Sequence, residues 1–116
     1  MASLERTLTG SFDAILAALD SAVRQSVSAT LEGSSDFNFS SGRCAVRVYE
    51  RYSAIGSNRV SLSLTLLKAD GEIRLSAITS GGSQAVFFKL NTLGEEAFLD
   101  SIRETVERLA PGTHQH

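Results

Sequence analysis

Cysteine and histidine are scarce in this chain. Cys44 is the single cysteine among 116 residues, so no disulfide can form within the chain. A reducing compartment such as the cytoplasm is therefore the expected location. The two histidines, His114 and His116, stand within the last three residues. A Ser-His-Asp arrangement needs a histidine placed by the fold, and structural zinc needs four ligands. The sequence thus predicts no catalytic residue, no metal site and no cofactor.

Long apolar runs are also missing. The most apolar segment, Phe12 to Val23, contains Asp13 and Asp20 and is too short to cross a bilayer. A signal peptide is not expected, because Arg6 is a lone early cation and Asp13 interrupts the apolar stretch that follows. We therefore expect a soluble protein with no membrane partner.

The composition is that of an ordinary globular protein. Hydrophobic residues make up 42% of the chain and charged residues 21%, which argues against disorder. The length predicts one domain over residues 1–110 with a flexible tail over residues 111–116. The net charge of −2 hides an asymmetry, since residues 43–89 contain seven basic and three acidic side chains. The middle of the chain is basic and both ends are acidic.

The spacing of apolar residues predicts two helices. Residues 12–25 have an apolar stripe at helical spacing, and Thr9-Gly10-Ser11 offers a cap before it. Thr92 and Glu95 have the spacing of a capping box, and a second apolar stripe follows them as far as Leu109. Pro111 ends this second helix.

Alternation of apolar and polar residues predicts strands before and between these helices. A short strand over residues 4–9 opens the chain. The further strands are expected over residues 26–32, 44–51, 59–66, 73–78 and 85–90. Asp70-Gly71 predicts a tight hairpin turn, because both residues accept positive φ. Residues 33–43, GSSDFNFSSGR, are rich in glycine and serine and predict the longest loop.

This order of elements predicts an α+β fold. We expect a two-layer sandwich in which a mainly antiparallel sheet of five to six strands has an N-terminal and a long C-terminal helix on one face. The order resembles the fold of one half of the TATA-box-binding protein, and a long C-terminal helix lying on a curved sheet resembles the helix-grip folds. Both likenesses concern topology alone and imply no function.

Three stretches of the sequence resemble a known family. They are RCAVRVYERYS, NRVSLSLTLLK and LSAITSGGSQAVFFKLNTLGEEAFLD. They are similar to a family of small bacterial proteins of unknown function, and the resemblance covers most of the chain. It implies no activity.

The outward face of the sheet is the main candidate binding surface. The residues expected there as ligand-binding groups are Arg47, Tyr49, Arg51, Arg59, Arg74, Phe87 and Lys89. Basic groups interleaved with aromatic rings suit a small anionic ligand or stacked single-stranded nucleic acid. An ordinary solvated sheet face is the alternative. The acidic overall balance argues against a dedicated nucleic-acid-binding protein, because such domains are usually strongly basic.

Two loops are further candidates. Phe37 and Phe39 are unusual in a plain linker, and a pocket beneath the loop over residues 33–43 would suit an enzyme. Gly81, Gly82 and Ser83 predict a hairpin turn, because a strand-like run follows them and the lysine of a phosphate-binding loop is missing. A backbone nest that binds an anion is the alternative there.

The leading hypothesis is a non-enzymatic binding or self-association module. Tyr49, Ile78 and Phe87 on an open sheet would form a patch that is costly to leave exposed. Packing of two sheets face to face in a C2 homodimer would cover that patch. A small anionic ligand on the same face is the other form of this hypothesis. The alternatives are a single-stranded nucleic-acid-binding module on that face and an enzyme with its pocket under residues 33–43.

Overall fold

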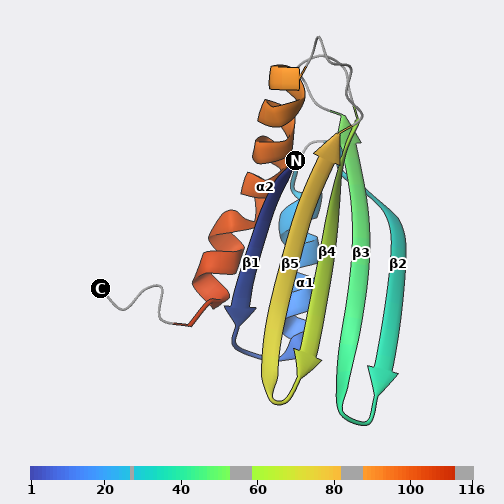
Figure 1. Ribbon diagram of the computed structural model, residues 1–116, viewed down its shortest axis with the longest axis vertical. Coiled ribbons are helices and arrows are strands. Elements are labelled where there is room, and N and C mark those ends of the chain that lie inside the picture. Colours follow the sequence, from blue (N-terminus) through green and yellow to red (C-terminus); the bar gives the residue numbers. More distant parts are fainter. Residues whose placement is uncertain (27, 53–58, 82–87, 112–116) are drawn as a thin grey trace.

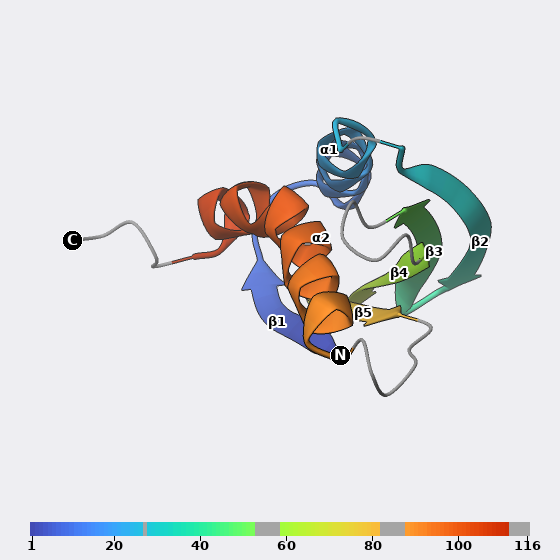
Figure 2. The ribbon, with the colours of Figure 1, turned by 90° about the horizontal axis from the view of Figure 1, so that it is seen from above.

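The chain forms a five-stranded antiparallel sheet with both helices on one side of it (Figures 1 and 2). This computed structural model describes residues 1–26, 28–52, 59–81 and 88–111, with residues 88–94 described by their backbone alone. The elements are β1 (Ala2–Leu8), α1 (Phe12–Arg24), β2 (Thr30–Phe39), β3 (Gly42–Tyr52), β4 (Arg59–Ala69), β5 (Glu72–Gly81) and α2 (Phe88–Leu109). The predicted α+β sandwich is confirmed.

The first strand joins the sheet at its edge. The strand order is β1-β5-β4-β3-β2, and β1 pairs with β5 along its whole length. Ala2, Leu4 and Leu8 are buried on the helix side, as the alternation of a half-buried strand requires. The Thr9 amide donates to the carbonyl of Leu109 at 3.0 Å, which ties this end of β1 to α2. The predicted strand near residues 4–9 is therefore confirmed.

Helix α1 has the cap and stripe that its sequence predicts. The Ser11 hydroxyl accepts a hydrogen bond from the Ala14 amide at 3.4 Å, and this satisfies a backbone donor at the helix start. Phe12, Ile15 and Leu19 are buried against the sheet and α2. One face of α1 thus supplies part of the core, which lies between the sheet and the two helices.

Two hairpins depend on glycine. Asp70 and Gly71 have φ of 55° and 74°, so the β4–β5 turn has the left-handed conformation that Asp-Gly favours. At the β2–β3 hairpin, glycine is needed because there is no room for a side chain at position 42. A Cβ at Gly42 would lie 2.1 Å from the carbonyl oxygen of Lys68, far inside van der Waals contact. Only glycine allows β3 and β4 to approach this closely.

The predicted loop over residues 33–43 is wrong. Residues 33–39 belong to β2, whose pairing with β3 runs from Thr30 to Phe39 with a bulge between Leu31 and Gly33. The strand predicted over residues 26–32 accordingly begins only at Thr30. An edge strand needs a pairing partner on one side alone, and its outer side chains can stay in water. The serine-rich composition therefore did not prevent a strand here.

The start of the second helix also differs from the prediction. Helix α2 begins at Phe88, so the strand predicted over residues 85–90 is wrong at residues 88–90, and residues 85–87 lie outside the described ranges. Thr92 and Glu95 stand inside the helix and form no capping box at its start. Glu95 is instead buried, and its carboxylate forms an ion pair with the amino group of Met1. A short apolar run does not distinguish a strand from a helix by its period alone.

Candidate functional site on the two faces of the sheet

The side of β3 that faces the helices is the one that the sequence predicted to face outward. Tyr49 is fully buried, and its direct neighbour on β4, Leu62, belongs to the same core. Side chains alternate along a strand, so Arg47 and Arg51 share the helix side with Tyr49. The prediction that these three residues line the outward face is wrong.

The reason lies in the apolar residues on both faces of β3. Cys44, Val46 and Val48 stand on one face, while Ala45 and Tyr49 stand on the other. Alternation alone does not decide which of two such faces is buried. Arginine is also compatible with the covered side, because its long apolar stem can lie on the core while its charged end reaches a partner.

Arginines of β3 connect the sheet to neighbouring elements on the helix side. The Arg43 guanidinium lies 4.2 Å from the ring centroid of Phe12 and 3.0 Å from the Asp13 carboxylate, both on α1. The Arg47 guanidinium lies 3.1 Å from the Asp36 carboxylate on β2. These cations are already engaged by carboxylates, so their role in this structure is to hold β2, β3 and α1 together.

A hydrogen-bonded group under α1 joins Tyr49 to Asp20. The Tyr49 hydroxyl donates to Asp20 Oδ1 at 2.6 Å, and Arg24 Nε lies 2.9–3.0 Å from both oxygens of that carboxylate. Burial opposes the charged form of Asp20, but the hydrogen bonds from Tyr49 and Arg24 and the charges of Arg24 and Arg47 lower its pKa on balance. Burial, and then the hydrogen bond to Asp20, raise the pKa of Tyr49 far above its usual value.

The opposite side of the sheet, here called the open face, consists of the strand side chains that point away from the helices. Figure 1 looks onto this side, with α1 behind the strands. One set of direct cross-strand neighbours on it, here called the Phe37 row, spans all five strands. The row consists of Phe37, Cys44, Leu67, Arg74 and Thr7.

The open face carries the large hydrophobic side chains that water reaches. Those exposed among the strand residues are Phe37, Phe39, Tyr52, Leu67 and Ile78. Phe37 is 52% exposed and Phe39 68% exposed. The half-buried Cys44, Val46 and Val48 lie beside them on β3. The sequence prediction placed Ile78 correctly but missed the β3 group, because it assigned that group to the core.

The charge on the open face is nearly balanced. Its charged residues are the arginines Arg59 and Arg74 and the glutamates Glu5, Glu50 and Glu72. Arg59 pairs with Glu50, and Arg74 Nε lies 2.8 Å from Glu72 Oε1. Of the predicted ligand-binding arginines, only these two lie on the open face, and each already has a carboxylate partner. The basic face that the sequence suggested is therefore not formed.

A shallow hollow of about 490 Å³ lies over β1, β5 and β4. Its lining residues are Glu5, Arg6, Thr7, Thr65, Leu67, Arg74, Leu75 and Ser76. Thr7, Arg74 and Leu67 of the Phe37 row are among these residues, so the hollow lies on the same face as the exposed rings and is separated from Phe37 by Cys44 on β3. The open face thus has exposed aromatic side chains on β2 and a depression over β4, β5 and β1.

The stretch over residues 33–43, predicted as a loop above an enzyme pocket, is instead largely part of the β2–β3 hairpin. Phe37 and Phe39 lie on β2, where they point to the open face. The expectation of an enzyme pocket beneath a loop at this place therefore loses its structural basis.

The remaining candidates lie at the junction of β5 and α2. Gly81 is the last residue of β5, and Lys89 lies on α2 and not on the sheet. The predicted turn at residues 81–83 falls largely outside the described residues and stays a prediction. A Cβ at Gly81 would lie 3.5 Å from Glu95 Oε2, and a carboxylate at that distance disfavours an anion at Gly81. Gly82, Ser83 and Phe87 lie outside the described residues.

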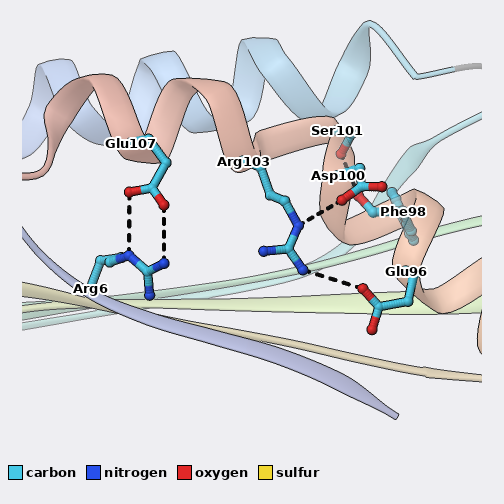
Figure 3. Close-up of polar contacts among 7 residues, drawn as sticks. All are labelled: Arg6, Glu96, Phe98, Asp100, Ser101, Arg103 and Glu107. Carbon is cyan, nitrogen blue, oxygen red and sulfur yellow. Dashed lines mark hydrogen bonds and ion pairs between the residues drawn. The ribbon is translucent and has the colours of Figure 1, made fainter. Parts of the chain in front are cut away.

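Ion pairs along α2 occupy further arginines (Figure 3). Arg6 on β1 makes two hydrogen bonds to the Glu107 carboxylate, at 3.0 and 3.3 Å. Arg103 lies between Asp100 and Glu96, with distances of 2.6 and 3.2 Å. The hydrogen bond from Arg6 lowers the pKa of Glu107. The Arg6–Glu107 contact fastens β1 to α2, and both Arg6 and Arg103 already have carboxylate partners.

Among the described residues, neither a metal-binding cluster nor a membrane-spanning helix is found. No three side chains of His, Cys, Asp or Glu within those ranges gather so that they could hold a metal ion. His114 and His116 lie outside them. No helix in the described part of the chain has both the length and the apolar content needed to cross a membrane.

Comparison with known proteins identifies the family. The chain belongs to a family of unknown function, DUF6054, whose model matches residues 1–110. This confirms the resemblance to a family without an assigned activity, while its bacterial character and the likeness to the TATA-box-binding protein stay predictions. No curated protein and no solved structure matches the chain.

Proposed function

We propose that the protein is a non-enzymatic self-association module whose open face packs against the same face of a second copy. The observation that carries this proposal is the set of exposed large hydrophobic side chains on that face, led by Phe37, Phe39 and Leu67. Contiguous exposed apolar surface with a polar surround is typical of interaction sites. Both helices lie on the other side of the sheet, so nothing in the described chain covers this patch.

The charge on the open face favours a second copy over an anionic partner. With three glutamates and two arginines, the face is close to neutral. A nucleic acid requires a surplus of positive charge, because phosphate contacts supply most of its non-specific affinity. A nearly neutral face does not repel its own copy, and its two signs can pair across a two-fold axis.

The cross-strand register of the face allows a symmetric contact between two copies. A two-fold axis parallel to the strands and lying over the β3–β4 pair would set β2 of one copy over β5 of the other. Phe37 would then lie over Arg74 and enter the hollow beside Leu67. An arginine over an aromatic ring is a favourable contact. By symmetry, the contact would form twice.

Neighbouring rows fit the same axis. Val48 would lie opposite Ser63, and Ile78 opposite Gly33, since these four residues form one cross-strand row. Each large side chain on one copy meets a small one on the other. This alternation lets two sheets approach closely, as they do in sandwich packing.

Sedimentation or light scattering over a concentration series tests the proposal. We expect the wild type to form dimers and Phe37→Glu to remain monomeric, because a charge would be buried at the contact. Ala17→Glu is the matched control, since Ala17 is exposed on α1 and the same charge is introduced on the other layer. That variant should dimerise like the wild type.

Other results would contradict the self-association proposal or place the contact elsewhere. A wild type that stays monomeric up to roughly 0.5 mM would contradict the proposal, since a Kd above 1 mM corresponds to less than about 4 kcal/mol of binding free energy. Equal dimerisation by wild type and Phe37→Glu would place the contact elsewhere. A monomer that binds single-stranded oligonucleotides with steep salt dependence would support the nucleic-acid alternative instead.

A further inference from the structure

Arg51 differs from the other half-buried arginines of the sheet. Arg43 and Arg47 each lie near a carboxylate, at 3.0 and 3.1 Å. Arg51 forms no ion pair with any described residue. All 13 acidic residues of the sequence lie within the described ranges, so no aspartate or glutamate elsewhere in the chain remains to pair with it.

The residues around Arg51 shield its guanidinium from water but supply no negative charge. Its guanidinium lies 4.7 Å from the ring centroid of Phe98, which is fully buried. Its Nη1 donates to the hydroxyl of Ser26, just beyond the end of α1. Burial lowers the pKa of Arg51. A half-buried cation with one neutral hydroxyl partner has lost hydration that its neighbours only partly replace.

A second serine hydroxyl, that of Ser28, contacts the backbone next to Arg51. The Ser28 hydroxyl accepts from the amide of Tyr52, the residue after Arg51, at 3.4 Å. The Ser26 and Ser28 hydroxyls thus both act as acceptors toward β3, and each keeps its own proton to donate. Ser28 has a φ of 63°, a conformation that is uncommon for a residue other than glycine.

We propose that Arg51, with the hydroxyls of Ser26 and Ser28, binds a small oxyanion, such as the phosphate or carboxylate group of a small ligand. The guanidinium offers further N–H donors beyond the one given to Ser26, and its planar edge matches two oxygens of such a group. Phe98 supplies an apolar floor beneath the cation. The site lies on the helix side of the sheet and does not depend on self-association through the open face.

An alternative reading makes Arg51 purely structural. The C-terminal end of α1 has partial negative charge, and together with the Phe98 ring it could compensate the cation without a ligand. The two readings predict opposite behaviour when the charge is removed. Replacing a structural arginine lowers stability in every buffer, whereas replacing a ligand-binding arginine lowers stability relative to the wild type only when the anion is present.

Thermal unfolding in sodium phosphate, compared with sodium chloride at the same ionic strength, distinguishes a ligand-binding Arg51 from a purely structural one. We expect phosphate to raise the midpoint of the wild type by roughly 5 °C at saturation, through preferential binding to the folded state. Arg51→Met should lose this shift, while its midpoint in chloride should equal or exceed that of the wild type. Arg59→Gln, which removes an exposed arginine of the open face, should keep the shift. Acetate in place of phosphate shows whether the site accepts a carboxylate.

Ser26→Ala provides a second test in which Arg51 is retained. Loss of one donor should weaken phosphate binding roughly tenfold, measured from the shift against phosphate concentration. The proposal is overturned if neither phosphate nor acetate shifts the wild type beyond chloride, or if Arg51→Met keeps the full shift. A marked loss of stability for Arg51→Met in chloride, with no anion response in the wild type, would establish the structural reading.

Discussion

The Tyr49 hydroxyl on β3 donates a 2.6 Å hydrogen bond to Asp20 on α1, although the two residues lie 29 positions apart. This contact joins a fully buried ring to a carboxylate that Arg24 also holds. It shows which side of β3 faces the helices. Since the side chains of a strand alternate, the same contact places Cys44, Val46 and Val48 on the open face.

Tyr49→Phe should lower the free energy of unfolding by about 2 kcal/mol, because a hydrogen bond to a charged group is lost while the ring packing stays. Urea denaturation at pH 7 measures the change. Tyr52→Phe is the matched control, since Tyr52 is 60% exposed and should change stability by less than about 0.5 kcal/mol. Equal effects of the two substitutions would contradict a specific role for the Tyr49 hydroxyl.

The raised pKa of Tyr49 predicts a loss of stability in alkali. The folded state opposes ionisation of Tyr49, whereas in the unfolded chain a tyrosine ionises near pH 10. Its contribution is therefore complete below about pH 10 and is lost as the pH rises further. Stability measured from pH 8 to pH 11 should fall more steeply for the wild type than for Tyr49→Phe. Parallel curves would show that Tyr49 is not the group responsible.

Gly42→Ala should destabilise the protein by more than about 2 kcal/mol. The added Cβ would lie 2.1 Å from the Lys68 carbonyl oxygen, so backbone must move at the β3–β4 pair. Gly33→Ala, on the neighbouring strand, is the control because no atom lies within 4 Å of a Cβ built there. Thermal or urea unfolding of both variants tests the difference. A Gly42→Ala protein as stable as Gly33→Ala would contradict the close approach.

Cys44 should report on self-association. It is half-buried on the open face between Phe37 and Leu67, so a second copy packed there would shield its thiol. The rate of alkylation per molecule is expected to fall several-fold as protein concentration passes the dissociation constant. Phe37→Glu should show one rate at all concentrations. A concentration-independent rate in a wild-type dimer would place the interface away from Cys44.

The sequence was most informative where one local feature decided the structure. The stripe of Phe12, Ile15 and Leu19 after Ser11 predicted α1, and Asp70-Gly71 predicted the β4–β5 turn. Helical period and positive φ are properties of a few neighbouring residues, so they need no knowledge of the fold. The family resemblance likewise followed from the sequence alone.

The candidate site was harder to predict. Of the residues proposed for the outward face, Arg59 and Arg74 lie there, but Arg47, Tyr49 and Arg51 lie on the helix side. The glycine- and serine-rich composition also hid β2, whose residues pair through their backbone. Pairing of an edge strand depends on its neighbour and leaves little trace in its own side chains.

By itself, therefore, the sequence determined the class of fold, the two helices and the alternation within most strands. Tertiary structure decided which face of β3 is buried, where the charges find partners, and that the exposed rings gather on one side. The physical reason is the two-residue period of a strand. When both faces carry apolar side chains, local pattern leaves them equivalent, and only the docking of α1 and α2 makes one of them the core.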